Sequence, residues 1–222
     1  MLKLVAFAAL FAGCTTGSSE AMLSDLPSPK ISGTNQSFAI DYDTSGGCYE
    51  LTPQVTATVD GNPVALGRGG QSTSNAFNGN DCIGMGFTFS IDAHAPVTSF
   101  VLADGQSTWN IDVANLAPDN WNVVSSATMT EGSDVTVAFS PALPGVAIAD
   151  VTITPDGLVQ FTQAPTNNTV HITADYCSAP HGSQLPGTIA LDLTVPSKRC
   201  TGPASCSFIA TTQTSSTTID VP

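Results

Sequence analysis

The sequence predicts an all-β fold of the β-sandwich type for the chain that follows residue 29. Three observations lead to this prediction: the composition, the alternation of apolar and polar residues, and the turn dipeptides between the alternating runs. Of the 18 acidic residues, 15 are Asp and 3 are Glu. Asp favours turns whereas Glu favours helices, so this ratio indicates strands joined by turns. Thr, Val, Ser, Gly and Pro are also abundant, as is typical of strands and turns.

The clearest alternating run covers residues 83–92, where Ile83, Met85, Phe87, Phe89 and Ile91 share one face. A period of two over ten residues predicts a half-buried strand. The same alternation predicts further strands around five groups of apolar residues: Phe38, Ile40 and Tyr42; Val55, Ala57 and Val59; Val135, Val137 and Phe139; Val170, Ile172, Ala174 and Tyr176; and Ile189, Leu191, Leu193 and Val195.

Turn dipeptides lie between these runs. Asp60-Gly61, Asp104-Gly105 and Asp156-Gly157 each separate two strand-like segments and predict hairpin corners. Short strands at such regular spacing are typical of a sandwich or a barrel.

The domain organisation follows from length and spacing. A turn-rich stretch near residues 114–121 ends one series of strands and precedes another, which predicts one module over residues 30–115 and a second over residues 116–222. Each has the size of an immunoglobulin-like β-sandwich, and the chain resembles bacterial immunoglobulin-like repeats. The resemblance implies two tandem modules; one larger β-sandwich is the alternative.

The N-terminus has a different character. Lys3 precedes an apolar run of about ten residues, which is typical of a secretory signal and too short to span a bilayer as a helix. The run ends in Ala12-Gly13-Cys14, which resembles the lipobox of bacterial lipoproteins, although Phe11 stands where Leu is usual. The resemblance implies that residues 1–13 are a removed signal peptide and that Cys14 carries a diacylglyceryl group and an N-linked fatty acid such as palmitate. A signal cut elsewhere, without lipid, is the alternative.

The residue after the cysteine is Thr15 rather than Asp, which in that family points to the outer membrane. Residues 14–29 are rich in Ser, Thr, Gly and Pro and are predicted to form the lipidated Cys and a flexible tether. A flexible chain of n residues has a mean end-to-end distance of roughly 5–6 Å × √n. The fifteen residues after Cys14 would therefore hold the first module about 20 Å from the membrane.

The net charge of the chain limits the classes of partner that it can bind. The whole chain carries −13, and removal of Lys3 with the signal leaves four basic against eighteen acidic residues, or −14. Such a surface repels nucleic acid, so no nucleic-acid partner is expected. The expected partners are the membrane, through Cys14, and a protein of the envelope or the cell surface.

The cysteines of an exported protein usually pair. Cys48 and Cys82 are the two in the first module, and we predict that they pair with each other. In the second module, strand directions place Cys200 and Cys206 at the same end and Cys177 at the other. We therefore predict a Cys200–Cys206 disulfide and a free thiol at Cys177.

Metal ligands are the main candidates for chemistry. Four residues of a strand span about 13 Å and metal–ligand bonds are near 2 Å, so His171 and Asp175 cannot share an ion. The remaining candidate ligands are Asp175, Cys177 and His181. Polar side chains on the outer face of a strand are usually solvated, so we expect no metal and no cofactor. Oxygen-rich turns that suggest calcium lack an ordered ligand spacing; they are Asp41 with Asp43, residues 78–81, and Asp119-Asn120.

Catalytic motifs are not evident. The chain lacks a Gly-x-Ser-x-Gly elbow. Trp109 and Trp121 suggest a sugar-stacking surface, but aromatic residues are few and burial is the commoner fate of Trp. We therefore expect a lipid-anchored, non-enzymatic lipoprotein of the outer membrane that is structural, adhesive or protein-binding. A lipid-anchored protein that binds calcium, a transition metal or glycan is the second hypothesis, and a hydrolase is the third.

Overall fold

The computed structural model describes residues 18–70, 72–75, 79–92, 95–116, 121–124, 128–130, 132–155, 161–163, 169–171, 182–212 and 214–221. Nearly all regular structure in these residues is β-strand, with two short 3-10 turns and no α-helix. The all-β prediction is therefore confirmed.

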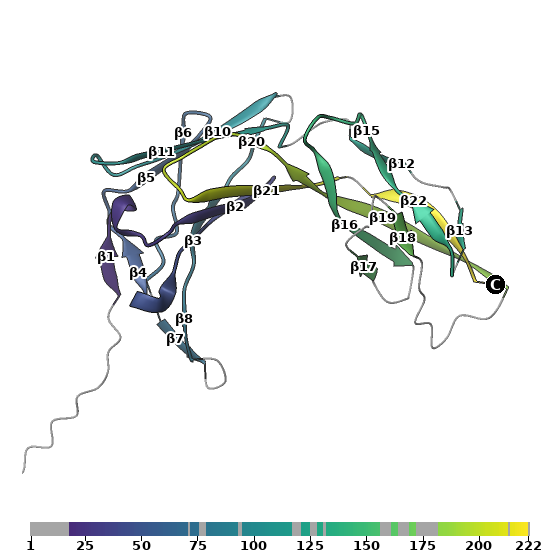
Figure 1. Ribbon diagram of the computed structural model, residues 1–222, viewed down its shortest axis with the longest axis horizontal. Helices are drawn as coiled ribbons and strands as arrows, with labels where there is room; N and C mark the ends of the chain where they lie inside the picture. Colours follow the sequence, from purple (N-terminus) through teal and green to yellow (C-terminus); the bar gives the residue numbers. More distant parts are fainter. Residues whose placement is uncertain are drawn as a thin grey trace, which may run out of the picture.

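The strands gather into two lobes that form an arch (Figure 1). The first lobe contains β1 (Ser19–Ala21), β2 (Lys30–Thr34), β3 (Ser37–Asp41), β4 (Tyr49–Leu51), β5 (Thr56–Val59), β6 (Asn62–Val64), β7 (Ser72–Asn75), β8 (Gly79–Cys82), β9 (Met85–Thr88), β10 (Val97–Ala103), β11 (Thr108–Ala114), β20 (Ser197–Thr201) and β21 (Ser205–Thr211), with the 3-10 turns η1 (Leu23–Asp25) and η2 (Thr44–Gly46). The second lobe contains β12 (Asn122–Val124), β13 (Thr128–Thr130), β14 (Asp134–Thr136), β15 (Ala138–Ser140), β16 (Ala147–Pro155), β17 (Phe161–Gln163), β18 (Thr169–His171), β19 (Ser183–Val195) and β22 (Ser215–Val221).

The first lobe packs one sheet on another. Its five-stranded sheet has the order β20-β11-β10-β5-β6, and the facing layer β21-β2-β3-β9 is one end of a nine-stranded sheet. Phe100 of the five-stranded sheet stacks on Phe208 of the other at a centroid distance of 5.8 Å, and Phe38 stacks on Phe87 at 4.7 Å. Such aromatic pairs add about 0.5–1.5 kcal/mol each beyond the area they bury.

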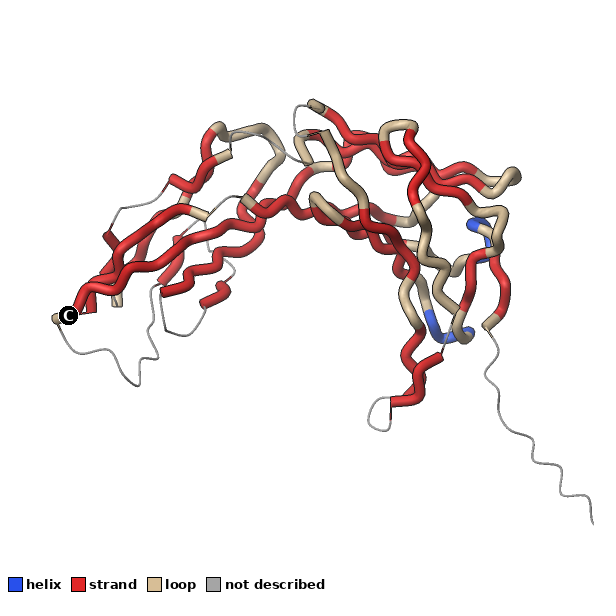
Figure 2. The backbone as a smooth tube through the Cα atoms, turned by 180° about the vertical axis from the view of Figure 1, so that it is seen from behind, coloured by secondary structure: helices blue, strands red, loops and turns tan. Residues whose placement is uncertain are grey.

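β19 joins the lobes. One edge of this 13-residue strand pairs with β16, and its other edge pairs first with β22 and then with β21. Between β21 and β22 lies Thr212, whose backbone N–H donates to Leu191 O at 2.9 Å. Its hydroxyl accepts from the Leu191 N–H at 3.1 Å. One continuous sheet therefore passes through both lobes, as the view from behind also shows (Figure 2).

This continuity corrects the predicted domain limits. β20 and β21 come from the predicted second module, yet β20 pairs with β11 and β21 pairs in parallel with β2. The boundary between residues 115 and 116 does not divide the sheets, and residues 116–222 are not a separate module. Local alternation shows which face of a strand is buried, but it does not identify a partner strand far away in the sequence.

The described strands follow the alternation only in part. Val135, Val137 and Phe139 do not share one strand, because β14 ends at Thr136 and β15 begins at Ala138, and Ile172, Ala174 and Tyr176 lie outside the described residues.

The run over residues 83–92 is mostly loop, because β9 covers only Met85–Thr88 and Ile83 is 42% exposed. Within β9, Gly86 has φ +155°, and an added Cβ would lie 2.1 Å from Phe38 O, so this close pairing with β3 requires glycine.

Two of the predicted hairpins are confirmed. Asp60 and Gly61 both have positive φ between the paired strands β5 and β6, and Gly105 has φ +85° between β10 and β11. Asp156-Gly157 lies outside the described residues.

Candidate functional site

The end of the first lobe at which the described chain begins is built around β1. This strand runs parallel to β4, with Ser19 opposite Tyr49, and the Ser19 N–H donates to Cys48 O at 3.1 Å. The Ser18 hydroxyl donates to a carboxylate oxygen of Glu50 at 3.3 Å. The chain is therefore fixed to the fold from Ser18 onward.

The residues after β1 fill the core of the lobe. Ala21 and Leu23 are each 1% exposed and Leu26 is 4% exposed. The flexible tether predicted over residues 14–29 is consequently wrong from Ser18 onward, and Cys14 to Gly17 lie outside the described residues. In the sequence, only the apolar side chains of Leu23 and Leu26 indicate that this segment is buried. Ser and Pro residues surround them, and the segment shows no strand or helix periodicity that would predict burial.

Asp104 fastens this segment to the β10–β11 hairpin. Its Oδ2 accepts from the Leu23 N–H at 2.8 Å, and its Oδ1 accepts from the backbone N–H groups of Gln106 and Ser107 at 2.9 and 2.6 Å. Burial opposes ionisation of this carboxyl, but the hydrogen bonds from Ser107, Leu23 and Gln106 outweigh it and hold the pKa below its usual value.

Disulfides brace both ends of the lobe. Cys48 pairs with Cys82 at a Cα–Cα distance of 5.4 Å and joins the chain before β4 to β8. Cys200 pairs with Cys206 at 6.0 Å and joins β20 to β21. Both predicted pairings are confirmed, whereas Cys14 and Cys177 lie outside the described residues.

Arg68 has a role that sequence reasoning missed. Its guanidinium donates to the carbonyl oxygen of Leu51, the last residue of β4. It also donates to the carbonyl oxygens of Thr52, Pro53 and Val55 in the turn between β4 and β5. Five donors in a fixed fork suit such a ring of acceptors. In the sequence, Arg68 stands among glycines, which indicate a loop and carry no sign of this contact.

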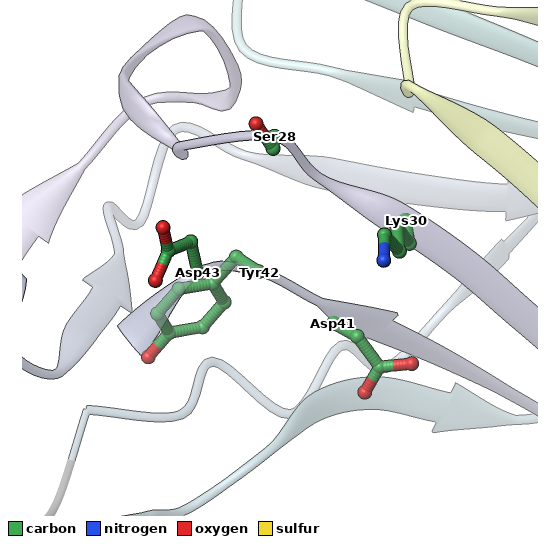
Figure 3. Close-up of a pocket in the computed structure, with 5 residues that line it drawn as sticks. All are labelled: Ser28, Lys30, Asp41, Tyr42 and Asp43. Atoms are coloured by element: carbon green, nitrogen blue, oxygen red, sulfur yellow. The ribbon is translucent and has the colours of Figure 1, made fainter. Parts of the chain in front are cut away.

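A hollow of about 410 Å³ lies beside β2 and β3, lined by Ser28, Lys30, Asp41, Tyr42 and Asp43. The carboxylates of Asp41 and Asp43 point away from each other in it (Figure 3). Asp41 accepts from the Ser32 hydroxyl at 3.2 Å, and Asp43 accepts from the Ser45 N–H at 2.9 Å. The Ser45 backbone and side-chain hydrogen bonds lower the Asp43 pKa. The two acids therefore form no converging calcium site.

A second hollow, of about 480 Å³, lies beside the β2–β3 turn and presents no charged group; it is lined by Asn35, Gln36, Thr88, Phe89, Ser90 and Ile91.

The two tryptophans are core residues. Trp109 is 4% exposed and covered by Gly202, where an added Cβ would lie 2.1 Å from the indole. Trp121 is 3% exposed and meets Phe139 edge to face at 5.5 Å. The sugar-stacking hypothesis for this pair is therefore wrong.

The predicted metal ligands cannot be placed. Asp175, Cys177 and His181 lie outside the described residues, as do Asn78, Asp119 and Asn120. His171 lies in β18 opposite Asp134 of β14. Within the described part of the chain, no group of three or more His, Cys, Asp or Glu residues is arranged to hold a metal ion.

None of the helical residues that the structure describes forms a helix long and apolar enough to cross a bilayer. Comparison of the chain with models of protein families, with curated proteins and with solved structures found no match.

Proposed function

We propose that this chain is a lipoprotein of the bacterial envelope, anchored in the outer membrane by acyl groups on Cys14, and that its β-lobes serve as a structural, adhesive or protein-binding element. The observation that carries the proposal is the position of the lipobox-like Ala12-Gly13-Cys14. It ends four residues before Ser18, the first residue that the structure describes, which is hydrogen-bonded to Glu50.

The disulfides support an exported location. Cys48–Cys82 and Cys200–Cys206 are both formed, and disulfides persist in oxidising compartments such as the periplasm and the cell surface. Two acyl chains, each adding about 0.8 kcal/mol per buried methylene, make membrane attachment stable, whereas a single chain binds reversibly.

The strand edges of the first lobe are protected against pairing with another chain. β6 carries Pro63, which has no N–H to donate. Gly67 covers the edge of β9 through two hydrogen bonds with Gly86, of 2.7 and 3.1 Å. β20 carries Lys198 and Arg199, and charged side chains discourage edge pairing. A partner would therefore meet loops and sheet faces of this lobe rather than its edges.

We also propose that the first lobe is an immunoglobulin-like sandwich. The packing of β20-β11-β10-β5-β6 on β21-β2-β3-β9 supports this, because two facing sheets around one core define that architecture. In this arrangement the two lobes are interleaved along the chain instead of following each other in tandem.

The proposal is tested by fractionation of the native host. The protein should partition into the detergent phase and incorporate an alkyne-bearing fatty acid, and the Cys14→Ser variant should do neither. A matched Cys177→Ser variant should behave as the unsubstituted chain. Equal behaviour of the Cys14→Ser variant and the unsubstituted protein would contradict lipidation at Cys14.

A further inference from the structure

The described part of the chain begins close to the proposed anchor. Four residue steps separate Cys14 from Ser18, and an extended chain spans at most about 3.6 Å per residue. The sulfur-bearing residue therefore lies within about 14 Å of Ser18 whatever path the chain takes. A tether of fifteen flexible residues would have left the lobe free to turn, whereas this one is too short to do so.

Ser18 belongs to a braced end of the first lobe. This end, which we call the β1–β4 end, consists of Ser18, β1, β4, η2 and the β7–β8 hairpin. The Ser19–Cys48 hydrogen bond joins β1 to the residue before β4, and the Cys48–Cys82 disulfide joins that residue to β8. The place at which the anchor enters the fold is therefore fixed relative to the hairpin.

The β7–β8 hairpin extends beyond the lobe on the same side as β1 (Figures 1 and 2). Its strands pair from Ser72 opposite Cys82 to Asn75 opposite Gly79. Four residues of strand reach about 13 Å beyond the disulfide, which is close to the reach of the tether. A stretched tether would thus bring the hairpin against the same surface that holds the acyl chains.

We propose that the β1–β4 end faces the lipid surface at contact distance and that the β5–β6 hairpin, on the opposite side of the lobe, points away from it. This inference rests on the lipid anchor proposed above. It identifies a membrane-facing surface and gives the β7–β8 hairpin the role of a spacer between the lobe and the headgroups.

The charge of the β1–β4 end indicates that the lipid anchor holds this end at the membrane and that electrostatic attraction to the headgroups does not. The acidic residues of the β1–β4 end are Glu20, Glu50 and Asp81, and no Lys or Arg occurs among its described residues. Arg68 lies at its border, where it donates to the Leu51 carbonyl. An acidic end gains nothing from an anionic bilayer. The Cys14→Ser variant should therefore not bind zwitterionic or anionic vesicles.

The orientation is tested with the acylated full chain in zwitterionic vesicles that contain a headgroup spin-labelled lipid. Thr44→Trp places a reporter in η2 and Asn62→Trp places a matched reporter in β6; both positions are exposed. The buried Trp109 and Trp121 supply a background that the unsubstituted protein measures. Quenching of the added emission should be at least threefold stronger for Thr44→Trp than for Asn62→Trp.

A tether variant serves as the second control. Inserting about 20 Gly and Ser residues between Gly17 and Ser18 extends the mean reach to roughly 25 Å, and quenching of Thr44→Trp should then fall to the level of Asn62→Trp. Equal quenching at both positions without the insertion overturns the orientation, and so does undiminished quenching with it.

The intact mass of the same sample distinguishes a failure of the proposed orientation from a failure of the proposed lipidation. Acylated protein without preferential quenching of Thr44→Trp contradicts the orientation while lipidation stands. Protein without lipid contradicts the proposed function, and this inference falls with it.

Discussion

Asp104 is the residue that ties the N-terminal segment to the sandwich. Its three backbone donors favour the charged form, so its folded pKa lies below the unfolded value near 4. A lowered pKa stabilises the fold above the unfolded pKa, and this contribution disappears as the pH falls through the folded value.

Asp104→Asn should therefore lower the free energy of unfolding by about 1.5–3 kcal/mol at pH 7, because it removes hydrogen bonds to a charged group. The difference from the unsubstituted protein should shrink below pH 4. Urea unfolding at pH 7 and pH 3 measures both values. Asp41→Asn is the matched control, since Asp41 is exposed and accepts one side-chain hydrogen bond, and it should change stability by less than about 0.5 kcal/mol. A pH-independent loss at Asp104 would contradict the role given to its charge.

Arg68 and Arg199 offer a comparison of the same side chain in two settings. Arg68 is half-buried and bonds four carbonyls, whereas Arg199 is 49% exposed and forms an ion pair with Asp112 at 2.9 Å. Arg68→Met should lower the unfolding free energy by about 2–3 kcal/mol because it leaves carbonyls unpaired. Arg199→Met should lower it by at most about 1 kcal/mol, as is usual for surface pairs. Equal losses in chemical denaturation would show that Arg68 does not organise the β4–β5 turn.

At the scale of the element, the two disulfides differ in the length of chain that they close. Cys48–Cys82 spans 34 residues and Cys200–Cys206 spans 6. In the chain-entropy model these loops correspond to about 4 and about 2 kcal/mol. The double variant Cys48→Ser, Cys82→Ser should therefore have the lower unfolding midpoint in thermal denaturation. A lower midpoint for the Cys200→Ser, Cys206→Ser variant would contradict this order.

Sequence patterns predicted the features of these elements that depend on residues close together in the chain or on residue type. Both disulfides, the Asp60-Gly61 and Asp104-Gly105 turns, and the buried face of β19 could be read from spacing and residue type. The close approach of Gly86 to Phe38 could not, because it depends on the pairing of β9 with β3, which lies far away in the sequence.

The candidate site was less accessible to sequence reasoning. The lipobox-like segment marked the anchor, but the distance from the anchor to the fold depends on Leu23 and Leu26. These residues are buried by tertiary contacts in a stretch without periodicity. Only the pairing of β1 with β4 and the Asp104 contact reveal that the tether is short.

At the scale of the whole molecule, the lobes are joined by hydrogen-bonded strands rather than by a linker. β20 and β21 complete both sheets of the first lobe, and Phe208 of β21 stacks on Phe100. A fragment of residues 18–116 lacks these strands and should not unfold cooperatively in urea. A fragment that adds residues 196–212 through a short Gly/Ser linker should recover cooperativity.

The linker in that control can be short because Val113 lies opposite Ser197 in the β11–β20 pair. Near-ultraviolet circular dichroism would report the packing of Trp109 in both fragments. Cooperative unfolding of residues 18–116 alone would contradict the interleaved arrangement and favour tandem modules.

The mass of the N-terminal peptide, measured on protein extracted from native membranes, tests the central claim most directly. The account predicts a peptide that starts at Cys14 and carries a diacylglyceryl group and an amide-linked fatty acid. An unmodified peptide with a different first residue would contradict it, because the short covalent link between bilayer and sandwich would then not exist.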